Sequence, residues 1–256
     1  MIFDDLYGLN MAILGPVTII LIGGAAELGS WLGLRFRGAP TEGAAISTLT
    51  GAALGLLALL LAFSFSIALS RYDARRNMVL EEANAIGTTA NFALMLPDPS
   101  PTLSLLRDYA AVRVGLGVPF DPLKMERDVA RSLDLQIRLW QQAVALTEAA
   151  PQSLPAYRYV ASLNEMNNIH ERRLTGLCYH VPAAVMFMLL GVAIVAMGFT
   201  GYNAGVTGGH RRIANMIMSV MIAMLIMLVV DLDRPSRGLI QVPVQALVDA
   251  AQGIRP

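Results

Sequence analysis

The stretch GAAISTLTGAALGLLALLLAFSFSIALS, residues 43–70, decides the fold of this chain. Its 28 residues include no Asp, Glu, Lys or Arg. An α-helix rises about 1.5 Å per residue, so roughly 20 residues cross a hydrocarbon core of about 30 Å. Residues 43–70 therefore predict a membrane-spanning helix.

Three further stretches have the same character. Residues 6–26 and 213–230 are uncharged, and residues 174–209 contain only His180 as a possible charge. The whole chain is 55% apolar and 15% charged, and its mean hydropathy of +0.55 is high for a soluble domain. We predict four transmembrane helices, at residues 11–34, 45–70, 178–201 and 212–232.

A polar block, residues 71–177, separates the second and third of these helices and contains 12 Lys/Arg and 12 Asp/Glu. PDPSPT (97–102) and PQSLP (151–155) interrupt helices, because proline lacks an amide donor and restricts its predecessor. We predict that the second membrane helix continues beyond the membrane to about residue 96. Two further helices are expected at residues 102–116 and 122–149. A last helix is expected to run from Ala156 directly into the third membrane helix. Leu133, Ile137, Trp140 and Val144 have helical spacing.

The predicted fold class is an all-α membrane protein with a helical cytoplasmic block between the second and third transmembrane helices. Its regions are residues 1–70 with two membrane helices, 71–177 with the block, and 178–256 with two more membrane helices and a tail. The positive-inside rule places the block and both termini in the cytoplasm. Seven arginines flank the membrane on that side and four on the other: Arg71, Arg75, Arg76, Arg172, Arg173, Arg234 and Arg237 against Arg35, Arg37, Arg211 and Arg212.

Composition and motifs exclude several function classes. Zero net charge makes nucleic acid an unsuitable partner. The sequence contains no HExxH, GxSxG, CxxC, Walker or GxGxxG motif, so we predict no enzyme, no catalytic residue, no cofactor and no metal. His170-Glu171 is interpreted as a solvated helix face, because no second His stands near it in the sequence.

The second membrane helix carries the candidate site. Gly55, Leu59, Phe63, Ser66 and Ser70 recur at intervals of four, four, three and four and therefore share one helical face. If several copies of this helix surround an axis, Leu59 and Phe63 form an apolar constriction that can gate by dewetting. Ordinary packing of these side chains is the alternative interpretation.

Charged residues near the membrane suggest further roles. Glu81 and Glu82 could form an acidic ring that concentrates cations, or a salt-bridged helix face. Asp231, Asp233 and Arg234 could cap the fourth membrane helix, bind a cation, or pair with Arg71, Arg75 or Arg76.

Other residues on the membrane helices suggest contacts. Glu27 needs a polar partner or water, because a carboxylate in a membrane helix is costly. The pairs Gly29/Gly33 and Gly51/Gly55 offer small-residue surfaces for close helix contact.

Three segments in order resemble the signatures of the bacterial bestrophin-like membrane proteins, a family classed as a domain of unknown function: LLAFSFSIALSRYDARRNMVLEEANAIGTTA (60–90), LNEMNNIHERRLTGL (163–177) and DLDRPSRGLI (231–240). A remoter similarity is to the bestrophin channels, which are pentamers with a pore formed by their second transmembrane helices. The resemblance implies a bacterial inner-membrane location, a neck at Leu59 and Phe63, and Arg71 at the end of the neck helix. Gly55 would widen that neck, and the calcium-binding acidic cluster of the animal channels is not recognisable.

Our leading hypothesis from the sequence is a homo-oligomer, a pentamer by resemblance, that passes small ions along an axis lined by the second membrane helix. Its partners are then the lipid bilayer, its own copies and small ions. The alternative is a non-conducting membrane scaffold or stress sensor whose cytoplasmic helices bind a partner protein.

Overall fold

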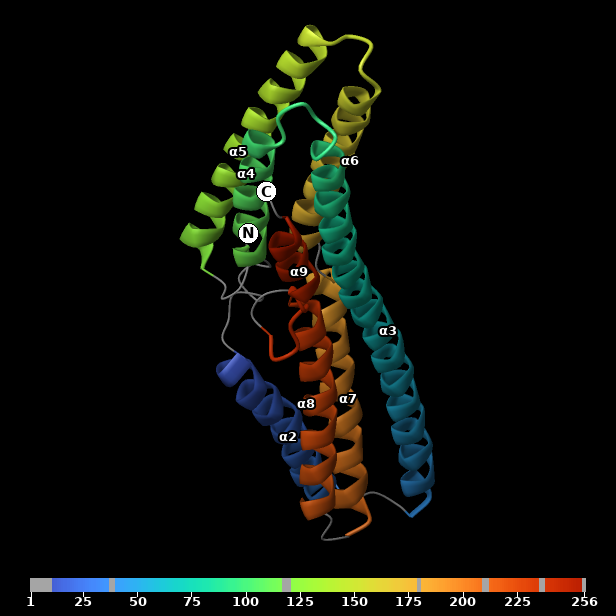
Figure 1. The fold of residues 1–256 in the computed structure, drawn as a ribbon. Coiled ribbons are helices and arrows are strands. Elements are labelled where there is room, and N and C mark those ends of the chain that lie inside the picture. Colours follow the sequence, from blue (N-terminus) through green and yellow to red (C-terminus); the bar gives the residue numbers. More distant parts are fainter. Residues whose placement is uncertain are drawn as a thin grey trace. The chain divides into compact units, whose positions relative to one another are not determined.

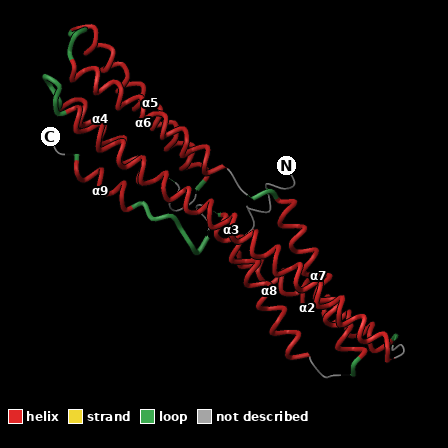
Figure 2. The backbone as a smooth tube through the Cα atoms, turned by 90° about the vertical axis from the view of Figure 1, so that its right-hand side faces the viewer, coloured by secondary structure: helices red, strands yellow, loops and turns green. Residues whose placement is uncertain are grey.

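The computed structural model describes residues 11–36, 40–116, 121–178, 181–208, 212–234 and 238–254. Within these ranges the regular structure is helical and no strand occurs (Figure 2). The all-α prediction is therefore confirmed for the described residues. Arg37, Arg211 and Arg237, which entered the count of arginines, lie outside them.

The chain divides into two compact units, and the long helix α3 (Pro40–Ala93) contributes to both. The first unit takes residues 1–71 and 180–234, and the second takes residues 72–179 and 235–256. The C-terminal segment thus groups with the polar helical block, whereas the sequence had suggested a region of residues 178–256.

The first unit contains α2 (Met11–Arg35), the first part of α3, α7 (Ala183–Val206) and α8 (Arg212–Asp233) (Figure 1). All four helices are long and apolar enough to cross a membrane. The four membrane helices predicted from the sequence are therefore confirmed as candidate spans.

The third membrane helix begins later than predicted. The sequence suggested an unbroken run from the preceding helix, with the span at 178–201, but α6 (Leu154–Cys178) ends at Cys178 and α7 begins at Ala183. Val181 and Pro182 are not helical. Proline disfavours the helical conformation of the residue before it, so Pro182 separates the two helices.

Helices α2 and α7 touch through their backbones. A Cβ atom added at Gly29 would overlap the carbonyl oxygen of Gly198, and one added at Gly33 would overlap that of Tyr202. Small residues allow such close approach between membrane helices. The close contact predicted for Gly29 and Gly33 is therefore confirmed.

The second glycine pair behaves differently. A Cβ atom at Gly51 or Gly55 would meet nothing within 4 Å. These two glycines of α3 make no close helix contact within the described part of the chain.

The second unit contains the rest of α3 with α4 (Ser100–Gly115), α5 (Pro122–Ala149), α6 and the short α9 (Gln245–Gly253) (Figure 1). The predicted helices at 102–116 and 122–149 are confirmed within two residues. Helix α5 starts at a proline, and the side chain of Asp121 accepts a hydrogen bond from the Leu123 amide at 3.0 Å. Both features favour a helix N-terminus.

The core of the second unit explains why the C-terminal segment joins it. Leu247 of α9 is fully buried in the same cluster as Leu103 and Leu106 of α4. On α5, Leu135 and Leu139 belong to this cluster, whereas the stripe at helical spacing is exposed. The exposed fractions are 40% for Leu133, 57% for Ile137, 39% for Trp140 and 42% for Val144.

Candidate functional site

The candidate pore face lies on the uncovered side of α3 in the first unit. Gly55, Leu59, Phe63, Ser66 and Ser70 are all exposed, with 53% of Leu59 and 59% of Phe63 accessible. The buried residues of this part of α3 include Leu57, Ser64 and Ala68. Successive helical residues are offset by about 100°, so the two sets lie on opposite sides of the helix. The predicted face therefore points away from the side of α3 that is buried in the unit.

The exposed side of α3 within the second unit carries polar side chains at the pore-face spacing, with Ala74, Arg76 and Leu80 exposed between them. The spacing of three and four residues continues along α3, and the exposed positions at that spacing are Asp73, Asn77, Glu81, Asn84, Thr88 and Asn91. Two of the six are acidic, four are uncharged and none is basic. This face offers oxygen and amide groups and a negative charge.

The two adjacent glutamates of the predicted acidic ring have different environments. The Glu81 side chain is 53% exposed and lies 3.8 Å from Arg172. Glu82 is fully buried between Arg113 of α4 and Arg173 of α6. Glu82 is thus salt-bridged to neighbouring helices, which is one of the two interpretations that the sequence left open.

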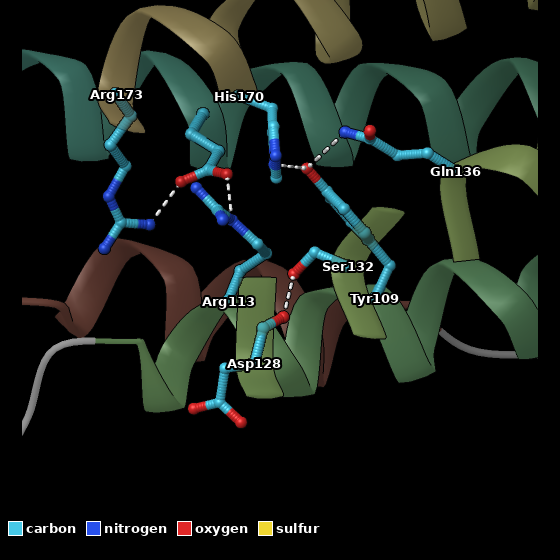
Figure 3. A network of polar contacts seen from close by, with 8 residues as sticks. Tyr109, Arg113, Asp128, Ser132, Gln136, His170 and Arg173 are labelled. Atoms are coloured by element: carbon cyan, nitrogen blue, oxygen red, sulfur yellow. Dashed lines mark hydrogen bonds and ion pairs between the residues drawn. The ribbon is translucent and has the colours of Figure 1, made fainter. Parts of the chain in front are cut away.

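Figure 3 shows the buried charge cluster around Glu82. The Arg113 Nε donates to Glu82 Oε1 at 2.5 Å, and Arg173 Nη1 donates to Oε2. One carboxylate therefore bridges two guanidinium groups that are at most 5% exposed. Burial lowers the pKa of the Arg173 guanidinium, and the Glu82 carboxylate opposes that shift. The cluster holds α3, α4 and α6 together and has a net positive charge.

His170 adjoins the cluster and is fully buried. Its Nδ1 lies 3.1 Å from the Tyr109 hydroxyl, to which Gln136 donates at 3.4 Å (Figure 3). The Tyr109 hydroxyl therefore connects the histidine ring to Gln136 of α5, and His170 Nε2 is buried without a hydrogen-bond partner among the described residues. Burial, with a further contribution from Arg113, lowers the pKa of His170 from 6.5 to about 4. The interpretation of His170 as a solvated helix face was wrong.

A periodic signal in the sequence could have revealed this cluster. Leu103, Leu106, Tyr109 and Arg113 recur at three, three and four residues, and all four are fully buried or 1% exposed. The spacing places Arg113 on the apolar face of α4, where an unpaired charge would be costly. A partner of opposite charge is therefore required, although spacing within α4 does not identify Glu82.

The sequence DLDR closes α8, and its charged side chains are buried. Asp231, Asp233 and Arg234 are at most 4% exposed. Asp233 Oδ2 accepts a hydrogen bond of 2.7 Å from the Val181 amide, just before α7. The carboxylate therefore joins the end of α8 to the start of α7, as a structural cap does.

The arginines near the end of the membrane part of α3 vary in burial. Arg75 is 5% exposed, Arg71 is partly buried and Arg76 is exposed.

Among the described residues, no three His, Cys, Asp or Glu side chains lie together as metal ligands would.

Glu27 of α2 has a partner at the first residue of α8. Its Oε2 lies 3.3 Å from Arg212 Nη2. The two side chains remain 54% and 79% exposed, respectively. A polar partner was one of the two possibilities that the sequence left open for Glu27.

Residues 20–247 match the model of a family described as the Bestrophin-like domain. Among proteins with curated descriptions the comparison found no match.

Solved structures share the fold over nearly the whole chain. A bacterial bestrophin homologue from Klebsiella pneumoniae has a TM-score of 0.66 at 16% identity, covering 96% of this chain and 97% of that one. A structure described as a membrane protein has a TM-score of 0.68 at 15% identity, covering 95% and 97%. A point variant of the Klebsiella pneumoniae homologue has a TM-score of 0.66 at 16% identity, with the same coverage of 95% and 97%. At these identities the likeness establishes the fold.

Proposed function

The chain belongs to the bestrophin-like family, and we propose that it is a homo-oligomeric ion channel whose pore is lined by α3. The observation that carries this proposal is the exposed face from Gly55 to Ser70, which is uncharged and lies opposite the buried side of the same helix. Copies arranged around an axis would bring this face together. Leu59 and Phe63 would then form the apolar neck, and Ser66 and Ser70 would line a wetter section.

The proposed assembly is a pentamer in a bacterial inner membrane, with the polar helical unit and both termini in the cytoplasm. The stripe of Leu133, Ile137, Trp140 and Val144 on α5 supports an assembly, because contiguous exposed apolar side chains mark interaction surfaces. In this proposal another copy of the chain covers the stripe.

We propose that the conducted ions are cations. On the exposed side of α3 in the second unit, Asp73 and Glu81 are the charged residues at the pore-face spacing, and both are acidic. Rings of carboxylates concentrate cations and repel anions. Glu82 is left out of this ring because it is buried between two arginines.

Recordings from the purified chain in planar bilayers test the neck. Phe63→Ala removes a side chain of the proposed constriction and should raise the open probability or conductance several-fold. Phe65→Ala is the matched control, because Phe65 is the same residue type, is 38% exposed, and points about 160° away from Phe63 around the helix. If both variants and the original chain gave equal currents, Phe63 would not line the pore.

The exposed stripe on α5 also favours a second function, a scaffold that binds a partner protein. Ile137→Asp discriminates, because Ile137 is 57% exposed and its replacement should leave the fold intact. If the Ile137→Asp variant no longer has the mass of the oligomer in lipid, the stripe makes contacts between copies of the chain. An intact oligomer that conducts as before assigns it to another protein.

A further inference from the structure

A cleft of about 500 Å³ lies between the membrane helices α2 and α8. Ile20 and Gly23 of α2 line one side, and Ile213 and Met216 of α8 line the other. A Cβ atom at Gly23 would meet nothing within 4 Å. The space beside Gly23 is therefore open, and the volume of the cleft is within the roughly 300–1,000 Å³ of ligand pockets.

The cleft carries one charge of each sign. Glu27 and Arg212 both line it, and their side chains lie 3.3 Å apart. Because the side chains are 54% and 79% exposed, most of their hydrogen-bonding capacity remains free. A guanidinium has five donors and a carboxylate about four acceptor positions, so each can hold a further group of opposite charge.

A buried amide faces the same cleft. Asn215 lines it, is only 9% exposed, and makes no side-chain hydrogen bond to any described residue. Ser219, one turn further along α8, also lines the cleft but donates its hydroxyl proton to the Asn215 carbonyl at 2.9 Å. The Asn215 amide is therefore a polar group in a membrane helix with no side-chain hydrogen bond to the part of the chain that the structure describes, and such groups are costly in lipid.

We propose that this cleft binds a phospholipid with a primary amine in its headgroup, such as phosphatidylethanolamine. The phosphate lies against Arg212, whose planar fork matches phosphate oxygens. The ammonium donates to Glu27 and to the Asn215 amide oxygen. An acyl chain fills the apolar part between Ile20, Ile213 and Met216, which are 68%, 77% and 70% exposed.

The chemistry of the cleft selects among headgroups. A choline headgroup has no N–H to donate to Glu27 or Asn215. A glycerol headgroup leaves the lipid with a net negative charge and gives Glu27 no cation. The site lies on α2 and α8, so it goes beyond the proposed pore on α3 and does not depend on conduction.

Native mass spectrometry of the full chain tests the proposal. The protein is purified in detergent and titrated separately with phosphatidylethanolamine, phosphatidylcholine and phosphatidylglycerol, and bound lipids are counted. Two charge-assisted hydrogen bonds should make the ethanolamine lipid bind about tenfold or more tightly than the choline lipid. Glu27→Gln should reduce that preference to about threefold or less, because one charged acceptor is lost.

A cleft-filling variant keeps the test independent of the ion pair. Gly23→Leu places a side chain in the cleft, where its Cβ would meet no atom within 4 Å, and leucine is also the better helix former. It should abolish the ethanolamine preference while the melting temperature is maintained. Gly191→Leu is the control, because Gly191 of α7 is exposed, has equally open space, and does not line the cleft.

Three results would overturn the proposal. Equal binding of the ethanolamine and choline lipids by the original chain would show that the protein does not recognise the headgroup. Unchanged binding to Gly23→Leu would place the lipid elsewhere. Loss of the oligomeric mass in Gly23→Leu, but not in Gly191→Leu, would mean that a neighbouring copy occupies the cleft.

Discussion

Replacing Glu82 with glutamine should destabilise the second unit strongly. The carboxylate bridges Arg113 and Arg173, and all three side chains are at most 5% exposed. Glutamine offers one acceptor oxygen and points an amide N–H₂ at the second guanidinium, and its neutral side chain leaves both buried guanidinium charges without a counter-charge. Removing one partner of a buried ion pair costs about 3–5 kcal/mol.

The two broken contacts share one carboxylate, so their costs are not expected to add. For a unit of this size, 1 kcal/mol shifts the melting temperature by about 4 °C, so we expect a decrease of about 12–20 °C. The assay is the loss of the monodisperse peak in size-exclusion chromatography after heating in detergent.

Glu81→Gln is the matched control, since it makes the same chemical change one residue earlier. Its side chain is 53% exposed and its contact with Arg172 is 3.8 Å long, so little stability should be lost. Melting temperatures that agree within about 2 °C for the two variants would refute the assigned role of Glu82, because a buried pair and an exposed pair would then cost the same.

A triple variant separates the uncompensated charge from the lost contact. Glu82→Leu combined with Arg113→Met and Arg173→Met removes all three buried charges and keeps similar volume. Replacement of a whole buried charge cluster by apolar residues is often neutral or stabilising. The triple variant should therefore melt well above Glu82→Gln.

Three more outcomes are expected from the structure. The pKa of buried His170 is lowered to about 4, so only the unfolded chain binds its proton between about pH 6.5 and pH 4, and the free energy of unfolding should fall by about 3 kcal/mol across that window. His170→Gln should flatten this dependence in melts recorded from pH 7.5 to 4, and an unchanged slope would contradict it. Gly201→Ala should weaken the α2–α7 contact, because its Cβ would overlap the Ala26 carbonyl oxygen; Gly191→Ala should melt like the original chain. Asp233→Asn should lower the melting temperature by several degrees, because the Val181 amide loses a charged acceptor; deuterium exchange at Val181 should become faster, and unchanged exchange would argue against the cap.

The sequence predicted the membrane helices well because their signal is local. A run such as residues 43–70 needs no knowledge of neighbours to be identified as a span. The start of α7 was misplaced because apolar composition continues through Val181 and Pro182, although proline chemistry ends the helix there. Gly29 and Gly33 were also identified, since small residues four apart form a recognisable surface.

The contacts between distant residues were harder to predict. Arg113 lies 31 residues after Glu82 in the sequence, and Arg173 lies 91 residues after it. No spacing within one helix therefore indicates that the three side chains meet. His170 was taken for part of a solvated helix face because no second His stands near it in the sequence, and its neighbours Glu171 and Arg172 are exposed in the structure. Burial of His170 depends on how α6 is turned against α4, which one helix alone does not determine.

The glycine contact between α2 and α7 restricts how the membrane unit can move. Backbone carbonyl groups of each helix lie directly against glycines of the other, at Gly29 and Gly33 of α2 and at Gly201 and Gly205 of α7. Sliding by one residue would drive a methyl group, such as that of Ala26, into the opposing backbone. Helices α2 and α7 should therefore travel as one rigid body, and any gating movement within this unit is left to α8 and to the membrane part of α3.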